Sequence, residues 1–208
     1  MQIMQADRGL LITLEGIDGA GKTTVARMLH KRFPDFVFTR EPTEGPLGEL
    51  ARSTEEPLEQ LFLFMADHAN HLRSVVLPSI SSGKIVVSDR YIDSRVAYQG
   101  ALLRDLVPLD WIYEIHMPWS RMPDMTLLFR IDPSLALERC TNRGATSIFE
   151  RESFLREVSR NFDILASREP ERFVVIDAER EISDVADRAA SEIERFIRRR
   201  NNLAGTQL

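Results

Sequence analysis

The sequence has little of what marks a secreted or membrane protein. Its 208 residues contain a single cysteine, Cys140, so no internal disulfide bond can form and a reducing compartment is expected. No stretch approaches the roughly 18 consecutive apolar residues of a membrane span, and the N-terminus lacks the apolar core of a signal peptide. We therefore expect a cytoplasmic protein with no membrane partner.

Positive charge is also in short supply. The 27 Lys and Arg residues are outnumbered by 32 Asp and Glu residues, which gives a formal net charge of -5. A surface that neutralises many phosphates of a nucleic acid would be basic, so polymeric nucleic acid is not an expected partner. Local basic clusters could still bind small anions.

Short apolar runs alternate with longer helical patterns along the chain. The runs are rich in β-branched or aromatic residues and do not alternate with polar ones, as expected for strands buried on both faces. They cover residues 10–15, 36–39, 85–88, 126–131 and 173–176, and helical patterns cover 22–32, 58–77, 133–142, 149–167 and 183–200. This order predicts an α/β fold of three layers, with a five-stranded parallel sheet flanked by helices, as one domain over residues 1–208.

The first apolar run leads directly into a glycine-rich motif. Residues 16–24 read GIDGAGKTT, which matches G-x-x-x-x-G-K-[ST] between a predicted strand and a predicted helix. Backbone N–H groups of such a loop surround phosphate oxygens, and the helix N-terminus points its positive dipole at them. Lys22 is expected to reach the β and γ phosphates, and Thr23 to offer its hydroxyl to Mg²⁺. The residues predicted to bind ATP are Gly16, Ile17, Asp18, Gly19, Ala20, Gly21, Lys22, Thr23 and Thr24. The alternative is a glycine-rich turn without a ligand.

Two further polar clusters follow the second and third apolar runs, at Arg40 and at Asp89 with Arg90. All three clusters should emerge at the carboxyl edge of a parallel sheet, where ligands bind. Asp89 lies where a carboxylate would hold Mg²⁺, partly through water. Two guanidinium groups suit the clamping of an acceptor phosphate, although either alone would more often be a surface ion-pair partner. The pattern therefore predicts a kinase that phosphorylates a nucleoside monophosphate. A GTPase would not need the arginines, and no N-K-x-D guanine motif is found.

The motifs resemble those of the thymidylate kinase family along most of the chain. The segments EGIDGAGKTT, TREPTEGPLGE, LFMADHANHL, SDRYIDSRVAYQG and MPDMTLLFRIDPSLALER occur in this order. The resemblance implies a five-stranded parallel core with a mobile lid, usually in a homodimer. It also implies conversion of dTMP and ATP to dTDP and ADP with Mg²⁺.

The resemblance further implies a set of contacts with dTMP. Arg40 and Arg90 would hold its phosphate, and Asp18 would face the sugar 3′-hydroxyl or the phosphates. Phe64 would stack on thymine, and Tyr98 would pack against the deoxyribose. From the residues alone, Phe64 shares a helix face with the residue four positions later, but a place in the core is the more common use of a helical aromatic residue.

The sequence departs from the family at position 68, where an arginine usually reads a thymine carbonyl. His68 is shorter and titratable, so this contact would be weaker, bridged by water, or supplied by Arg95, which follows Ser94. The segment TREPTEG departs from the commoner TREPGGT and leaves the geometry of that loop open. The residues predicted to bind the substrate are Asp18, Arg40, Phe64, His68, Arg90, Ser94, Arg95 and Tyr98.

The lid is expected around residues 139–151. Family members carry an arginine in the P-loop or supply one from the lid, and residues 17–20 contain none. Arg143, followed by Gly144 at a predicted helix end, is the first choice for the lid arginine, with Arg139 and Arg151 as alternatives. Lys22, Arg90 and Arg143 are thus the predicted catalytic residues.

The predicted reaction is a direct in-line transfer that needs no general base, because the acceptor phosphate is already mostly dianionic. Two other functions remain open. One is phosphorylation of another nucleoside monophosphate or a deoxynucleoside, and the other is nucleotide sensing without catalysis.

Overall fold

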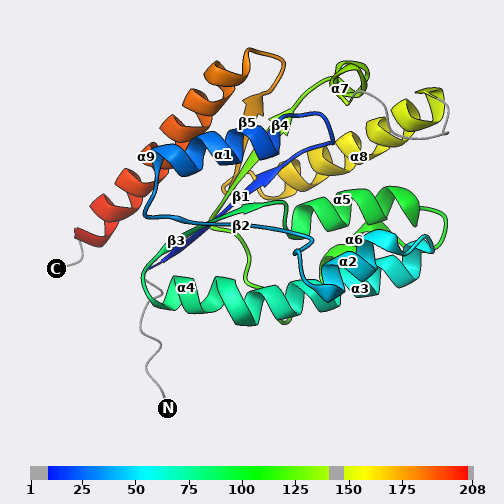
Figure 1. Cartoon of the computed structure of the whole chain (residues 1–208), viewed down its shortest axis with the longest axis horizontal. Coiled ribbons are helices and arrows are strands. Elements are labelled where there is room, and N and C mark those ends of the chain that lie inside the picture. Colours follow the sequence, from blue (N-terminus) through cyan, green and yellow to red (C-terminus); the bar gives the residue numbers. More distant parts are fainter. Residues whose placement is uncertain (1–8, 141–147, 206–208) are drawn as a thin grey trace.

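The protein folds around one parallel sheet. The computed structural model describes residues 9–140 and 148–205. Within them the strands are β1 (Leu10–Glu15), β2 (Val37–Arg40), β3 (Ile85–Asp89), β4 (Met125–Arg130) and β5 (Phe173–Asp177). They pair in the order β2-β3-β1-β4-β5, and every pairing is parallel (Figure 1). The predicted five-stranded parallel sheet is confirmed.

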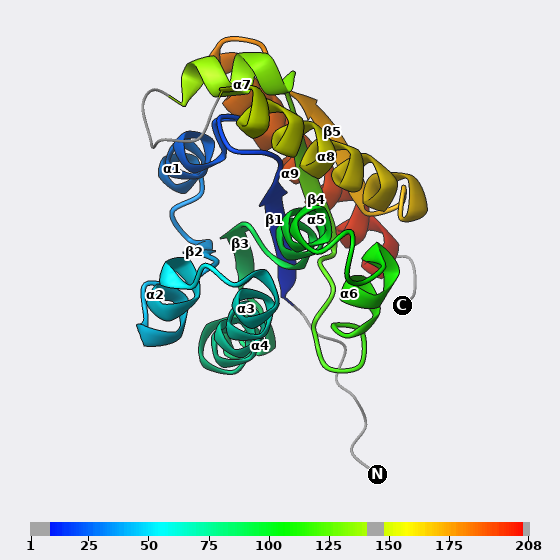
Figure 2. The ribbon, with the colours of Figure 1, turned by 90° about the vertical axis from the view of Figure 1, so that its right-hand side faces the viewer.

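Helices cover both faces of this sheet. They are α1 (Lys22–Arg32), α2 (Pro46–Ser53), α3 (Pro57–His71), α4 (Leu77–Ser81), α5 (Ile92–Leu102), α6 (Leu109–Glu114), α7 (Pro133–Arg139), α8 (Ile148–Arg168) and α9 (Ile182–Gly205), and a π-helical turn, Leu72–Val76, joins α3 to α4. Helices α1 and α9 pack together on one face, whereas α3, α4, α5 and α8 cover the other (Figures 1 and 2). This helix–sheet–helix arrangement agrees with the predicted three layers.

The sequence patterns did not predict α2, α5 and α6. Most of α5 is buried, including Asp93 and Arg95, so it lacks the one-sided apolar stripe by which an amphipathic helix is recognised. Helices α2 and α6 span only 8 and 6 residues, too few for a period of 3.6 to show. Helix α7 ends at Arg139 and Cys140 is already outside the helix, whereas residues 141 and 142 of the predicted 133–142 helix lie outside the described residues.

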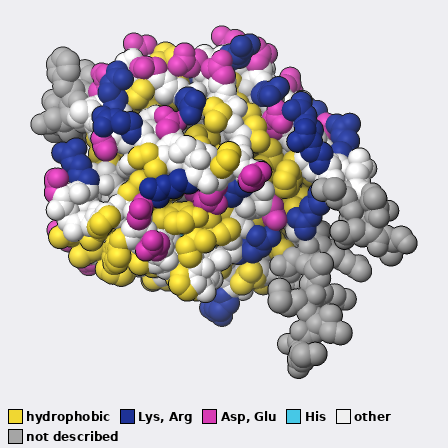
Figure 3. Space-filling model, turned by 180° about the vertical axis from the view of Figure 1, so that it is seen from behind, with side chains coloured by type: hydrophobic (Ala, Val, Ile, Leu, Met, Phe, Trp, Pro, Cys, Tyr) yellow, Lys and Arg dark blue, Asp and Glu magenta, His cyan; other side chains and the backbone are white. Residues whose placement is uncertain are grey.

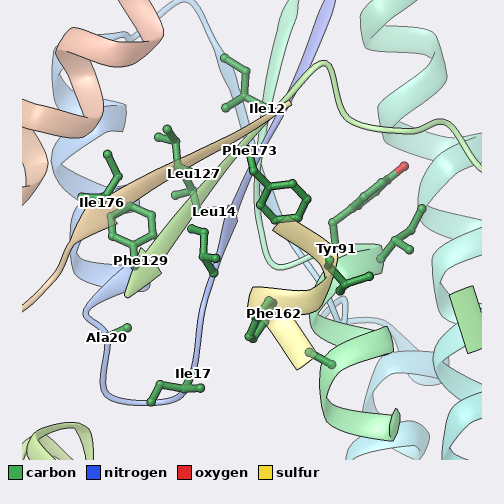
Figure 4. Packing of buried hydrophobic residues seen from close by; sticks show 14 of the residues in the cluster. Ile12, Leu14, Ile17, Ala20, Tyr91, Leu127, Phe129, Phe162, Phe173 and Ile176 are labelled. Carbon is green, nitrogen blue, oxygen red and sulfur yellow. The ribbon is translucent and has the colours of Figure 1, made fainter. Parts of the chain in front are cut away.

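The hydrophobic core lies on both sides of β1. Every residue of this strand is buried. Figure 4 shows Ile12 and Leu14 close to Leu127 and Phe129, while Phe162 of α8 lies on the side of α5. The loop that follows β1 therefore starts from a strand held by packing on both faces.

The rear face of the molecule is mixed in character. Hydrophobic side chains gather over its lower half, and charged side chains predominate along its upper edge (Figure 3). In the part of the chain that the structure describes, no helix is both long and apolar enough to cross a membrane.

A buried ion pair ties α5 to the turn before β5. Arg172 donates to both carboxylate oxygens of Asp93, at 2.7 and 2.8 Å, and to the hydroxyl of Thr126 at 2.6 Å. The side chain of Asp93 is fully buried and that of Arg172 is 9% exposed. Such a pair stabilises the fold little more than a well-packed apolar pair would. Removing one partner is nevertheless costly when it leaves the other charge buried without a counter-ion.

We expect Arg172→Ala to lower the free energy of unfolding by about 3–5 kcal/mol, because the fully buried Asp93 side chain is left, among the described residues, with only a 3.4 Å hydrogen bond from Thr126. Urea denaturation measures the change. Asp163→Ala is the control, since Asp163 pairs with Arg130 on the surface with about half of each side chain exposed. Its loss should cost less than about 1 kcal/mol. Equal losses in the two variants would contradict the role given to the buried pair.

Candidate active site

The P-loop joins β1 to α1 and packs tightly against the backbone of β4 and α7. A Cβ atom at Gly19, where φ is +88°, would lie 2.2 Å from the carbonyl oxygen of Ala136. At Gly16, where φ is +140°, it would lie 2.5 Å from the carbonyl oxygen of Phe129. Both positions therefore require glycine, for the backbone angle and for the close approach.

Lys22 lies at the start of α1 with its ammonium group turned into the loop. Its Nζ atom donates to the carbonyl oxygens of Gly16 and Ile17, both at 2.8 Å. Burial, together with the nearby charge of Arg90, lowers the pKa of Lys22 to about 8. Phosphate oxygens at this place would favour the charged form of the ammonium group.

Thr23 and Asp89 bring two oxygen ligands together at the ends of α1 and β3. The Thr23 hydroxyl donates to Asp89 Oδ2 at 2.7 Å, and the buried Oδ1 atom has no hydrogen-bond partner within the described residues. A hydroxyl and a carboxylate suit Mg²⁺, which usually keeps several waters and takes further oxygens from phosphates. No cluster of three or more His, Cys, Asp or Glu side chains occurs in the ranges described, so a metal held here would take only part of its shell from the protein.

Arg90 follows β3 with its backbone in the left-handed region, at φ +70°. A residue other than glycine adopts this conformation at a cost of about 1 kcal/mol or more, which its surroundings must offset. Its Nη1 atom donates to the Ser94 hydroxyl at 3.1 Å, and its Nη2 atom donates to the Asp18 carboxylate. The Tyr98 ring lies under the guanidinium at 4.9 Å, and its hydroxyl accepts from the backbone N–H of Asp18 at 2.8 Å.

The ion pair with Arg90 keeps Asp18 charged. Burial alone would raise the pKa of this carboxyl, but the charges of Arg90 and Lys22 lower it below its usual value. The P-loop and the segment after β3 are thus joined by an ionised pair at the carboxyl edge of the sheet.

A cavity of about 950 Å³ opens at this edge of the sheet. The predicted residues that line it include Asp18, Lys22, Thr23, Arg40, Asp89 and Arg90. Its volume is large enough for more than one nucleotide-sized group. Arg40 is half exposed and lies 3.7 Å from Glu44, whereas Arg90 is more deeply placed. The structure therefore brings both predicted phosphate-binding arginines to the cavity that holds Lys22.

Other predicted substrate residues do not line this cavity. Phe64 is half-buried, and its backbone carbonyl accepts from Arg95 at 3.3 Å. His68 is fully buried on the inner side of α3. Ser94 and Tyr98 contact Arg90 instead. Their predicted contacts with a substrate stay predictions.

Glu41 is the centre of a buried network beside the cavity. Its Oε1 atom accepts from Nδ1 of His68 and of His71, each at 2.7 Å, and its Oε2 atom accepts from Arg95 at 3.0 Å. Although burial opposes ionisation, His68, Arg95 and the hydrogen bonds from both imidazole rings hold the pKa of Glu41 well below its usual value. The carboxylate can therefore only accept hydrogen bonds, which places a proton on Nδ1 of both rings.

The network occupies both ring nitrogens of His68. The Nε2 atom of His68 lies 3.1 Å from the Ser120 hydroxyl. Burial lowers the pKa of His68, so the ring is neutral and Nε2 accepts a hydrogen bond from this hydroxyl. A direct contact between His68 and a base edge would require one of these hydrogen bonds to break. The ring serves instead, in this arrangement, to connect α3 with the segment before β4.

Arg95 is fixed by the same network. Its Nε atom donates to Nε2 of His116 at 2.9 Å, while Nδ1 of His116 lies 2.7 Å from the carbonyl oxygen of Ile112. Burial and the charge of Arg95 lower the pKa of His116 to about 3. The remaining buried Nη2 atom of Arg95 has no hydrogen-bond partner among the described residues.

The sequence prediction missed part of the cavity wall. Residues 179–182, which follow β5, line the cavity, and Arg139 donates to the carbonyl oxygens of Ala178 and Glu179 at 2.7 and 3.0 Å. The polar cluster after the last apolar run could have been found by the rule that located the clusters after the second and third runs. The role of Glu41 had no comparable sequence pattern, because its side-chain partners lie on two distant helices, α3 and α5.

The predicted lid is described only in part. Arg143 and Gly144 lie outside the described residues. Arg139 at the end of α7 and Arg151 in α8, the two alternatives to Arg143, both line the cavity. The lid position and its mobility stay predictions.

Comparison with known proteins gives the family. A family model of thymidylate kinase matches residues 14–189. The chain belongs to the thymidylate kinase family. The P-loop, Arg40, Arg90 and the residues after β5 all fall within the matched range.

Individual thymidylate kinases agree with this placement. A probable thymidylate kinase from Methanococcoides burtonii is 48% identical over 186 residues, which cover 86% of this chain and 92% of that protein. Another, from Halobacterium salinarum, is 49% identical over 177 residues, with coverage of 81% and 87%. The crystal structure of thymidylate kinase from Ehrlichia chaffeensis is similar with a TM-score of 0.70 and 27% identity, and it covers 89% of this chain and 98% of that one.

The buried histidines predict a stability that falls with acidification. A histidine whose pKa is lowered in the folded state takes up its proton mainly on unfolding, so the free energy of unfolding decreases as the pH falls below 6.5. We expect each such histidine to lower the free energy of unfolding by up to roughly 1.4 kcal/mol per pH unit, and Glu15, whose pKa burial raises to about 8, to offset the contribution of one of them. Urea denaturation at about pH 6.5, 6.0, 5.5 and 5.0 measures the slope. These pH values lie above the usual pKa of a glutamate side chain.

His116→Gln separates the contribution of that ring. The amide can still accept from Arg95 but does not titrate in this range. Its slope should be shallower by up to roughly 1.4 kcal/mol per pH unit than that of the unmodified protein. Identical slopes in the two proteins would rule out the neutral buried His116.

Proposed function

We propose that this protein transfers the terminal phosphoryl group of ATP to dTMP, giving dTDP and ADP, as a step in dTTP synthesis. The observation that carries the proposal is the shared cavity, which Lys22 of the P-loop lines together with Arg40 and Arg90. The Lys22 ammonium group suits the phosphates of the donor, and the Arg40 and Arg90 guanidinium groups suit the phosphate of an acceptor. Membership of the thymidylate kinase family supports dTMP as that acceptor.

On the donor side, ATP would bind along the P-loop, residues 16–24, with its phosphates at the start of α1. Residues 179–182 support a place for the nucleoside part, because Ile182 lies close to Gly21 and the segment lines the same cavity. Arg139 holds this segment through two backbone carbonyls and so fixes that wall.

Mg²⁺ bound with ATP would neutralise charge between the β and γ phosphates. Thr23 and Asp89 would hold it, partly through water, and the unpaired Oδ1 atom of Asp89 supports this assignment. The hydroxyl of Thr23 would then exchange its hydrogen bond to Asp89 for a place beside the ion.

On the acceptor side, Arg40 and Arg90 would grip the dTMP phosphate. Asp18 would face the sugar 3′-hydroxyl or the phosphates, and its contact with Arg90 supports this role. The remaining acceptor residues in the proposal are Phe64, His68, Ser94, Arg95 and Tyr98. Phe64 would stack on thymine, and the unpaired Nη2 of Arg95 supports a polar role for this arginine near the base.

The chemistry follows from alignment and charge. The dTMP phosphate has a second pKa of about 6 and needs no base to become a nucleophile. Lys22 and Arg90 would hold the donor and acceptor in line through a loose transition state, and a lid arginine would meet the charge that develops. Arg143 remains the first choice for that arginine, and the cavity supports Arg139 and Arg151 as its alternatives.

We further propose that the protein acts in the cytoplasm as a homodimer. The family resemblance supports the dimer, and the hydrophobic side chains gathered on the rear face offer a surface for a second copy (Figure 3). The single cysteine supports a reducing compartment.

The acceptor is tested by measuring ADP release with dTMP, dUMP, UMP, dCMP, AMP and GMP. We expect dTMP to have the highest kcat/KM. A different best acceptor would exclude thymidylate phosphorylation while leaving a monophosphate kinase. ATP binding without any acceptor-dependent turnover would indicate a nucleotide sensor instead. A sensor would not need Arg40 and Arg90 to hold a second phosphate.

The site is tested by Lys22→Ala and Arg90→Ala. Each should lower kcat/KM for dTMP by at least roughly a hundredfold, because each removes a cation that stabilises charge in the transition state. The thermal midpoint should change little. Arg104→Ala is the control, since that side chain is 64% exposed and does not line the cavity. Normal dTMP phosphorylation by both cavity variants would refute the site.

A further inference from the structure

Glu15 is a buried acid for which the proposed reaction has no use so far. It is the last residue of β1, directly before the P-loop, and its side chain is fully buried. Its Oε1 atom has no hydrogen-bond partner within the described residues. Burying an ionisable group with an unpaired oxygen costs stability, so an apolar residue at this position would fold at least as well.

The other oxygen of Glu15 leads to the acceptor arginine. The Ser94 hydroxyl donates to Oε2 of Glu15, and the same hydroxyl oxygen accepts from Nη1 of Arg90 at 3.1 Å. Because a hydroxyl has one proton, its bond to Glu15 leaves the oxygen lone pairs facing Arg90. Glu15 therefore determines which way Ser94 presents its oxygen.

The guanidinium of Arg90 is consequently held at two ends. Nη2 bonds to the carboxylate of Asp18 on the P-loop, and Nη1 is held through Ser94 by Glu15 at the end of β1. Both anchors belong to the segment that binds the phosphoryl donor. The arginine is thereby fixed relative to the donor site as well as to its own helix.

We propose that Glu15 is a positioning residue for phosphoryl transfer: through Ser94 it fixes the Arg90 guanidinium beside the P-loop, in the orientation that receives the acceptor phosphate. The inference rests on the proposed function, because it takes Arg90 as the acceptor arginine. It assigns Glu15 no contact with the substrate.

The protonation of Glu15 suits this role. Burial, reinforced by the negative charge of Asp93, raises the pKa of Glu15 to about 8, while Ser94, Arg90 and Lys22 act in the opposite direction. A neutral carboxyl group can accept the Ser94 hydrogen bond without cancelling the charge of Arg90. The full positive charge of the arginine then remains for the phosphate, whereas an ionised partner at this depth would compete with it.

Glu15→Leu and Glu15→Gln test the proposal in the full-length protein. Leucine has a similar volume but cannot accept from Ser94, so the KM for dTMP should rise roughly tenfold while the KM for ATP changes less than about twofold. The thermal midpoint should stay the same or rise. Glutamine keeps a carbonyl oxygen and no charge, so it should restore most of the dTMP affinity.

Thr13→Val is the matched control. Thr13 lies two residues earlier on the same strand and is fully buried, and among the described residues its hydroxyl bonds to that of Thr126, at 2.9 Å. The substitution removes a buried hydrogen bond without touching Arg90, so neither KM should change. Parallel changes in both KM values with a lowered thermal midpoint in all variants would show that Glu15 is merely structural.

Two outcomes overturn the proposal. One is an unchanged KM for dTMP in Glu15→Leu, and the other is a Glu15→Gln variant as impaired as the leucine variant. If Glu15→Leu does not fold, Ser94→Ala takes its place, and an unchanged dTMP KM in that variant overturns the proposal equally. Failure of the proposed function can be told apart from failure of this inference, because the unmodified protein would then not turn over dTMP. In that case the KM values of the Glu15 variants and the unmodified protein are compared for the best acceptor instead.

Discussion

The pairing of β1 with β3 is the interaction on which the site depends. The strands run parallel with Leu14 opposite Asp89, and the N–H of Arg90 extends the ladder by donating to the carbonyl oxygen of Leu14 at 3.0 Å. The P-loop and the acceptor arginine therefore leave the sheet in the same direction, from strands roughly 4.8 Å apart. The separation of donor and acceptor is set by backbone hydrogen bonds, and the loops need only continue from that point.

The buried charges are arranged so that the cations of the cavity survive burial. Arg90 is balanced by Asp18 and, beside the cavity, Arg95 is balanced by Glu41, whereas burial raises the pKa of Glu15 and favours its neutral form. Among the described residues Lys22 bonds to two carbonyl oxygens and to no carboxylate, and burial together with the charge of Arg90 lowers its pKa. Phosphate oxygens bound at the P-loop would favour the charged form of Lys22.

The sequence predicted those parts that follow local rules. Local rules cover the continuous apolar runs of β1 and β3 and the glycine spacing of the P-loop, because each depends on residues that are close in the sequence. The structure has these elements where they were predicted. Helix α5 was missed because its buried face carries charged residues whose partners come from distant segments. The sequence leaves the base contact of His68 open, and nothing in the neighbouring sequence indicates Glu41 and Ser120, which His68 contacts in the folded chain.

The Glu41 network makes positions 68 and 95 interdependent. One carboxylate serves two imidazole rings and one guanidinium, and it carries a single negative charge. An arginine at position 68 beside Arg95 would place two permanent cations against that one anion in a buried space, which is costly. An arginine introduced at position 68 would therefore call for a compensating neutral residue at position 95. The two positions share one carboxylate, so a substitution at either changes the electrostatic surroundings of the other.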